Sequence, residues 1–198
     1  MSAPAEMAAR CLLRAGVFPA DPLDMLRRSR GVWLATDREL AGTEGFAGLP
    51  PEEDARLYRY RTKDGRQMYG VCYREGAGES RLRFSLAHEL GHIALRHLGE
   101  MRGVSAETRR REEDEAQAFA AALLTPAPLL ALLRERFGSS PDLTAAVFGV
   151  SRSMAALALL REAEAPGGEL SGRLIAAFGA QVTERGRRAS KSLENGTR

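Results

Sequence analysis

Two neighbouring segments, ARLYRYR at 55–61 and QMYGVCYRE at 67–75, combine apolar and aromatic residues with polar ones. We expect them to be two β-strands, because the TKDGR segment between them carries Asp64-Gly65, a pair typical of a hairpin turn. A third β-type segment is GVWLAT at 31–36. The pattern therefore predicts a small antiparallel sheet.

Helical spacing of the apolar residues characterises most of the remaining chain. Several of these segments begin near a proline and end at a glycine, as helices commonly do. The expected helices cover residues 4–15, 20–29, 81–97, 107–124, 128–138, 141–164 (two helices around Gly149) and 169–182. The combined pattern predicts an α+β fold, with the sheet packed against helices.

The composition is that of an ordinary soluble protein, with 44% hydrophobic and 28% charged residues in a chain of 198. No apolar run approaches the ~20 residues that cross a membrane, and we find no secretory signal. Cys11 and Cys72 lie far apart and fit no metal-ligand spacing. We therefore expect a cytoplasmic protein with two free thiols and no membrane partner.

The net charge of +3 is confined to the end of the chain. Residues 186–198 carry four basic side chains and one acidic one, so the rest of the chain is neutral. We expect this segment to be a disordered, solubilising basic tail. Direct nucleic-acid binding is therefore not indicated by the charge.

All three histidines of the chain lie between residues 88 and 97, and two of them form the motif H-E-x-x-H. On a helix, His88 and His92 share one face, one turn apart, so both imidazoles can bind the same zinc ion. Glu89 is rotated by one position and can reach a zinc-bound water. The motif predicts a metal site in which Glu89 is the general base.

His97 lies nine residues after His88, about half a turn round the helix. The longer motif H-E-x-x-H-x-x-G-x-x-H would need Gly at 95 and His at 98, and both positions are leucine. We therefore expect His97 to be a surface residue and the third ligand to be a carboxylate.

The helix at 107–124 offers several carboxylates. At 100° per residue, Glu112 and Glu115 fall within about 40° of Phe119 on the apolar stripe, whereas Glu113 and Asp114 point away. A buried carboxylate needs a partner, which a metal would supply. This periodicity leaves Glu112 and Glu115 as alternatives, and an exposed Glu115 at a fraying helix start also fits it.

Two segments carry a resemblance to a known family. RFSLAHELGHIAL (83–95) and EDEAQAFAAALLTP (113–126) are similar to the motifs of the ImmA/IrrE family of zinc metallopeptidases. The second motif matches at Glu115, Ala116, Phe119, Ala120, Leu123, Leu124 and Pro126. The resemblance implies a zincin-like domain over residues 1–138, one zinc ion per chain, and Glu115 as the third ligand beside His88 and His92.

The same resemblance implies an intracellular endopeptidase. Family members typically cut a helix-turn-helix repressor that is encoded nearby, and so derepress genes under stress. The partner expected here is such a repressor. The sequence does not identify the substrate-binding residues, and the side chain that stabilises the transition state stays open among Tyr58, Tyr60, Tyr69, Tyr73 and Arg83.

A separate helical segment, 139–185, carries a helix-turn-helix skeleton at Ala145, Gly149 and Ser151. Its second helix offers few side chains that read bases, so packing or docking onto a partner is favoured over DNA binding. The alternatives to a peptidase are a DNA-binding regulator and a repressor-binding protein with a latent zinc site. Because a purely structural zinc site needs no general base, Glu89 argues against the first.

Overall fold

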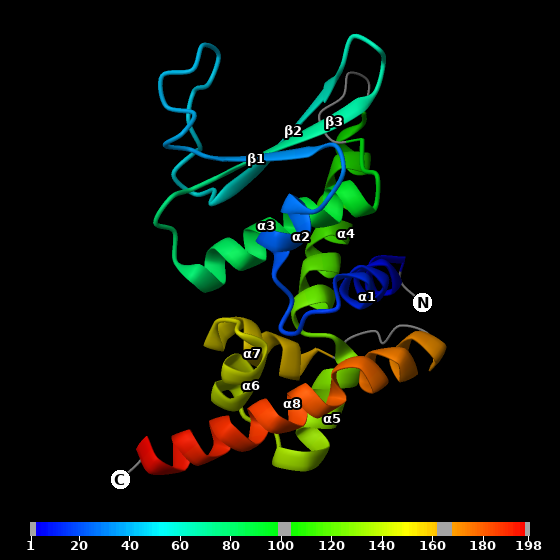
Figure 1. Cartoon of the computed structure of the whole chain (residues 1–198), viewed down its shortest axis with the longest axis vertical. Helices are drawn as coiled ribbons and strands as arrows, with labels where there is room; N and C mark the ends of the chain where they lie inside the picture. The colour runs from blue at the N-terminus through cyan, green and yellow to red at the C-terminus, as the bar shows by residue number, and fades with distance from the viewer. Residues whose placement is uncertain (1–2, 99–103, 162–167, 197–198) are drawn as a thin grey trace. The chain divides into compact units, whose positions relative to one another are not determined.

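The computed structural model describes residues 3–98, 104–161 and 168–196. In this part of the chain the elements are α1 (Ala3–Ala15), α2 (Pro22–Arg27), β1 (Val32–Thr36), β2 (Ala55–Arg61), β3 (Gln67–Tyr73), α3 (Glu79–Ala94), α4 (Ala106–Leu124), α5 (Ala127–Phe137), α6 (Pro141–Phe148), α7 (Arg152–Leu160) and α8 (Gly168–Gly196). Most of the described residues are helical and three strands form one small sheet, which confirms the α+β prediction (Figure 1).

The sheet has the strand order β1-β3-β2. β2 and β3 form the expected antiparallel hairpin, and Gly65 in its turn takes a φ of 80°, which favours glycine. The prediction of an antiparallel sheet is wrong for β1, which pairs parallel to β3. Thr36 at the end of β1 and Ala55 at the start of β2 both pair with Tyr73, so the loop at 37–54 begins and ends at the same end of the sheet. β2 therefore runs opposite to β1, and β3 runs in the direction of β1.

Gly70 lets the indole of Trp33 lie against the central strand. The two residues are paired across β1 and β3, and a Cβ at Gly70 would lie 2.8 Å from Trp33 Nε1 and nearer still to the ring carbons. A side chain at this position is therefore incompatible with the present place of the indole.

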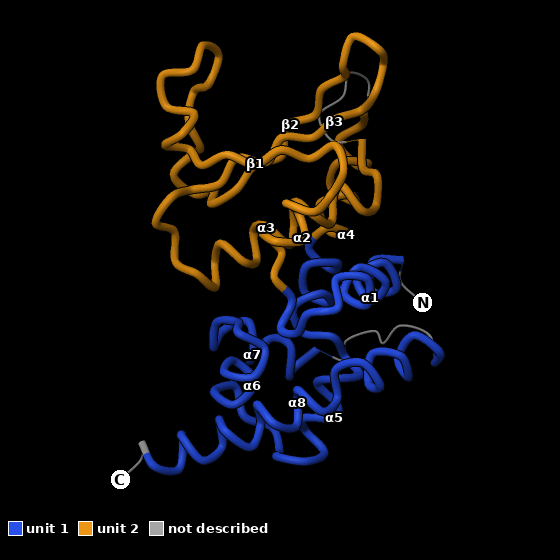
Figure 2. The backbone as a smooth tube through the Cα atoms, viewed as in Figure 1, with its two compact units in different colours: residues 1–20, 117–198 blue, residues 21–116 orange. Residues whose placement is uncertain are grey.

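The chain divides into two compact units, of which residues 21–116 form one (Figure 2). Within this unit α3 packs against α2 and against strands β2 and β3. Leu86, Ala87 and Leu90 of α3 and Val71 and Cys72 of β3 are almost completely buried. This core fixes α3 beside the edge strand β2, and the candidate site lies between them.

The other unit comprises residues 1–20 and 117–198. Its helix α8 has an apolar stripe with a spacing of four residues: Leu170, Leu174, Phe178 and Val182 are all buried. This division differs from the expected boundary at 138, because α5 packs extensively on α8 and so belongs with the C-terminal helices.

The expected disordered tail at 186–198 is wrong as far as the structure describes it, because α8 continues to Gly196. Gly186 packs against Phe137 and Leu133 of α5, where a Cβ would lie only 2.6 Å from the Phe137 ring. Glu184 pairs with Arg187 and Arg188 at 2.7 and 2.8 Å. Packing and pairs at i,i+3 and i,i+4 thus extend the helix into a segment whose composition alone suggested disorder.

In the described ranges, no helix by itself is both long and apolar enough to cross a membrane. Two bent pairs, α4 with α5 and α6 with α7, meet that test only when each pair is taken together.

Candidate metal centre

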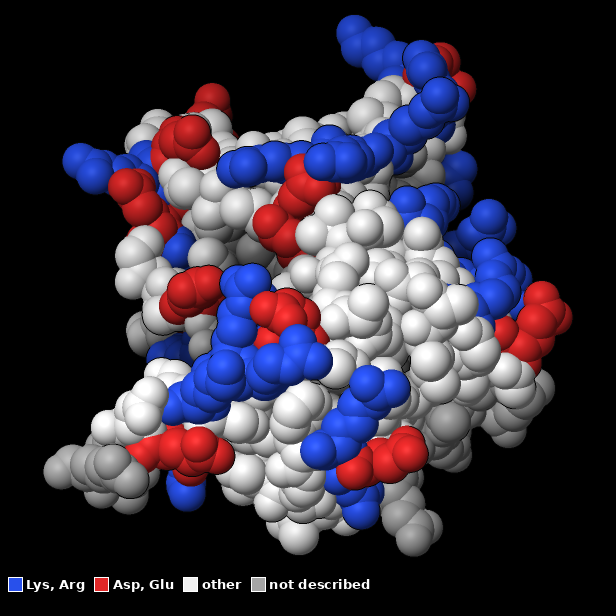
Figure 3. Space-filling view, turned by 60° about the horizontal axis from the view of Figure 1, so that its bottom comes forward, with Lys and Arg blue, Asp and Glu red and all other residues white. Residues whose placement is uncertain are grey.

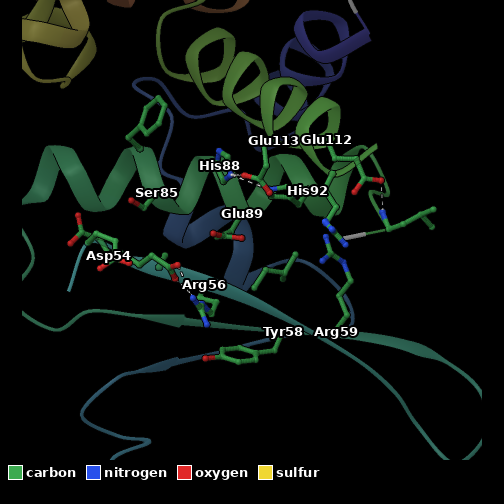
Figure 4. A pocket seen from close by; sticks show the side chains of 17 residues that line it. Asp54, Arg56, Tyr58, Arg59, Ser85, His88, Glu89, His92, Glu112 and Glu113 are labelled. Carbon is green, nitrogen blue, oxygen red and sulfur yellow. Dashed lines mark hydrogen bonds and ion pairs between the residues drawn. The ribbon is translucent and has the colours of Figure 1, made fainter. Parts of the chain in front are cut away.

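Three side chains converge between α3 and α4. His88 Nε2 and His92 Nε2 lie 3.0 Å apart, as expected for residues one turn apart on α3. The carboxylate of Glu113 on α4 bridges them, with Oε2 3.1 Å from His88 Nε2 and Oε1 3.4 Å from His92 Nε2 (Figure 4). One ligand atom from each residue lies within 4.8 Å of the others, a grouping that can hold one metal ion.

Glu113 thus takes the place that was expected for Glu115. The expectation assumed that the ligand lies on the buried apolar stripe of the helix. Glu113 is about 120° away from Phe119 on α4, and its side chain is 62% exposed. A carboxylate that faces an open pocket does not need to lie on the buried stripe, so the periodicity does not indicate which carboxylate meets the histidine pair.

The two glutamates on the apolar stripe of α4, Glu112 and Glu115, contact the residues that follow α3. Glu112 is 5% exposed, and its carboxylate accepts a hydrogen bond from the backbone N–H of Leu98 at 2.7 Å. Glu115 Oε2 lies 3.0 Å from His97 Nε2. Both carboxylates therefore hold the turn that follows α3, behind the histidine pair.

The expectation that His97 is a surface residue is wrong. His97 is 7% exposed, and its Nδ1 lies 3.0 Å from His92 Nδ1. The helix ends at Ala94, Arg96 takes a φ of 59°, and the His97 N–H bonds to the carbonyl of His92. The rule of 100° per residue fails here because the chain turns back on itself after α3.

The histidine pair opens into a pocket of about 790 Å³. α3 and α4 line one side, and residues 52–59 at the start of β2 line the other. Of the five candidates considered for the transition state, all within the described ranges, only Tyr58 lines this pocket. Arg59 also lines it but was not predicted from the sequence, because β2 carries three arginines and no sequence signal distinguishes one of them.

The environment keeps the imidazoles neutral. Burial, together with the neighbouring His88, His97 and Arg59, lowers the pKa of His92 to about 3. Burial also lowers the pKa of His88, although the carboxylate of Glu113 opposes that shift. Neutral imidazoles keep a ring nitrogen lone pair, which metal binding requires.

Glu89 lies on the same helix and points toward β2 (Figure 4). It is 9% exposed, and burial together with the charge of Glu113 raises its pKa to about 8, while Arg59 acts in the opposite direction. A carboxyl group with a raised pKa in a pocket can both take up and release a proton near neutral pH.

Arg59 reaches from β2 toward α3 and α4 (Figure 4). Its Nε and Nη2 are buried and have no hydrogen-bond partner among the described residues. A buried hydrogen-bond donor without a partner costs free energy. This guanidinium is therefore suited to bind an anion or a carbonyl oxygen that enters the pocket.

Comparison with known proteins gives one informative match. The sequence model of Peptidase_M78, described as an IrrE N-terminal-like domain, matches residues 50–160. This range includes the strands of the hairpin, the histidine pair and Glu113, and it confirms the resemblance inferred from the two motifs. No curated protein and no solved structure matched the chain.

Proposed function

Because the chain belongs to the Peptidase_M78 family, we propose that it is a zinc-dependent endopeptidase whose metal is held by His88, His92 and Glu113. The observation that carries this proposal is the convergence of two neutral imidazoles and a carboxylate beside the buried Glu89. Three protein ligands that face an open pocket are the arrangement of a catalytic zinc site, whereas structural sites use four.

The donor set fits zinc. Imidazole nitrogen and carboxylate oxygen are both common zinc ligands, and the three donor atoms already lie close together without any rearrangement. When bound, zinc would act as a Lewis acid toward water and a peptide carbonyl, and its charge would favour the ionised form of Glu89.

Glu89 is the proposed general base. Its carboxylate accepts a proton from the attacking water and then delivers this proton to the leaving amine, so that one group serves both steps. Burial suits it to this role because a raised pKa brings proton uptake and release closer to neutral pH.

Arg59 is the proposed stabiliser of the transition state. The carbonyl oxygen of the scissile bond gains negative charge during attack, and fixed donors aimed at that charge lower the barrier. Nε and Nη2 of Arg59 are buried donors that lack a partner in the described structure and face the same pocket as Glu89. Arg59 therefore replaces the tyrosines as the leading candidate for this role.

The outer edge of β2 is the proposed site for an extended substrate segment. β2 is an edge strand, since it pairs only with β3 in the described sheet, and its residues 55–59 line the pocket. A substrate strand could pair with this edge through main-chain hydrogen bonds. Because such pairing is nearly independent of sequence, selectivity would come from side-chain pockets and from docking elsewhere.

The proposed substrate is a helix-turn-helix repressor that is cut at one or few bonds, so that its genes are derepressed. This identity rests on the family resemblance. α7 offers a surface on which such a partner could dock, because Leu157 is 52% and Leu160 is 82% exposed.

A DNA-binding regulator remains the second candidate. α6 and α7 meet at 111°, within the range of helix-turn-helix pairs. However, the exposed face of α7 presents Leu157 and Leu160, and Arg152 on this helix already pairs with Asp142 at 2.8 Å. On the face drawn in Figure 3, acidic side chains lie beside the basic ones. These features favour the peptidase.

The test is to incubate the zinc-loaded chain with the repressor that is encoded beside it and, separately, with casein. Glu89→Gln serves as the matched control. We expect one or few cuts in the repressor with the wild type, none with Glu89→Gln, and little digestion of casein. Rapid digestion of casein with an intact repressor would indicate a general protease. A stable complex without cleavage would favour a repressor-binding protein.

A further inference from the structure

His92 has a second contact behind the proposed ligand set. Its Nε2 belongs to the cluster with His88 and Glu113, whereas its Nδ1 lies 3.0 Å from His97 Nδ1. His97 Nε2 in turn lies 3.0 Å from Glu115 Oε2. His92, His97 and Glu115 thus form a continuous hydrogen-bonded series that leads from the pocket to the surface of α4.

The direction of these hydrogen bonds follows from the chemistry of the ring. A histidine that binds a metal through Nε2 must leave the lone pair of that atom free, so its proton is on Nδ1. His92 Nδ1–H then donates to His97 Nδ1. With Nδ1 as the acceptor, the ring proton of His97 is on Nε2, from which it donates to Glu115.

The local fold holds this series in place. The His97 N–H is bonded to the His92 carbonyl at 3.0 Å, and the neighbouring Leu98 N–H is bonded to Glu112 at 2.7 Å. The His97 side chain is only 4% exposed, whereas that of Glu115 is 41% exposed. His97 is therefore a fixed buried acceptor, and Glu115 is the charged group at its outer end.

We propose that His97 and Glu115 are positioning residues that fix the tautomer and the ring orientation of His92 for metal binding, an inference that rests on the proposed function. Partners of this kind usually change metal affinity by about 10–100-fold. Glu115 would thus contribute to the metal site through His97 and not as a ligand.

A first experiment measures the zinc dissociation constant of the full chain by competition with a chromophoric chelator. His97→Phe keeps a buried ring but removes the acceptor, and we expect zinc binding to weaken by about 10–100-fold. His97→Asn places an amide oxygen near the position of Nδ1, and we expect it to restore most of the affinity. Glu115→Ala should weaken binding by about tenfold, whereas the exposed neighbour Asp114→Ala should not change it.

The opposite order of zinc affinities, with His97→Phe binding more tightly than His97→Asn, would overturn the inference. If His97 only fills space, His97→Phe keeps the affinity and His97→Asn loses it. If Glu115→Ala bound zinc as tightly as the wild type and His97→Asn, that result would also overturn the inference. This comparison holds even if His97→Phe fails to fold. If the wild type itself bound no zinc, the proposed function would fail, and that result is distinct from zinc binding that is insensitive to these variants.

A second experiment reads the tautomers directly. The chain has three histidines, so long-range ¹H–¹⁵N spectra of the zinc-loaded protein are easily assigned. We expect the proton of His92 on Nδ1 and that of His97 on Nε2. A His97 that carries its proton on Nδ1, or protons on both nitrogens, could not accept from His92 and would overturn the inference.

Discussion

Glu113 Oε2 lies 3.1 Å from His88 Nε2, although Glu113 is on a different helix and 62% of its side chain is exposed. The carboxylate that meets the histidine pair therefore comes from the open side of the pocket. Glu112 and Glu115, which are on the more buried face of α4, hold the turn at His97 and Leu98 instead.

Loss of a residue that contacts a ligand, but not the metal itself, usually weakens metal binding by roughly 10–100-fold. Glu113→Ala should weaken zinc binding by more than this, because it removes a proposed direct ligand. Glu115→Ala should cost less, and Asp114→Ala should be neutral. Chelator competition measures all three, and circular dichroism checks that the exposed substitutions leave the fold intact. A larger loss for Glu115→Ala than for Glu113→Ala would restore Glu115 as the ligand.

Glu89→Gln should keep the metal and lose turnover. The amide has nearly the same shape but cannot accept a proton at neutral pH, and general base catalysis is typically worth about 10²–10⁴-fold. Zinc content and single-turnover cleavage are measured on the same preparation. Cleavage at the wild-type rate by a zinc-loaded Glu89→Gln chain would mean that another group takes the proton.

Gly70→Ala should destabilise the fold by about 1–3 kcal/mol, because the new Cβ would overlap the indole of Trp33. Gly172→Ala is the matched control: it lies in α8 with open space around it, and it should be neutral or stabilising by up to about 1 kcal/mol. Urea unfolding measures both. Equal stability of Gly70→Ala and wild type would show that the indole can move aside at no cost.

Both thiols should react slowly in the folded protein at pH 8. Burial raises the pKa of Cys72 to about 11 and also raises that of Cys11, so at pH 8, below these values, both remain largely in the unreactive thiol form. Ellman's reagent should label two thiols rapidly only after denaturation, or as the pH approaches 11. Fast labelling of the native protein at pH 8 would contradict this burial.

The sequence was sufficient to predict the features that depend on local spacing. H-E-x-x-H placed His88, Glu89 and His92 in the site because residues at i and i+4 on a helix share a face. The hairpin around Asp64-Gly65 followed from two β-type segments with a turn pair between them. Most helices lie close to where apolar periodicity and end signals placed them, although α8 runs well beyond the expected 169–182.

The remaining features depend on contacts between different helices, strands and loops. The spacing of residues along one element does not predict such contacts. Which carboxylate meets the histidine pair depends on which side of α4 faces the pocket, whereas the stripe around Phe119 favoured Glu115 over Glu113. His97 was misplaced because the helix ends at Ala94 and the positive φ of Arg96 turns the chain back. The parallel pairing of β1 depends on a long loop, and the order of α8 depends on packing against Phe137.

An anomalous-scattering map recorded at the zinc edge from crystals of the zinc-loaded chain tests the proposed metal centre most directly. We expect one peak per chain, with His88 Nε2, His92 Nε2 and the Glu113 carboxylate within bonding distance and with Glu89 nearby but not bound. His92→Ala crystals should lack the peak. A peak bound by His97 or Glu115, or a peak that persists in His92→Ala, would contradict the proposed centre.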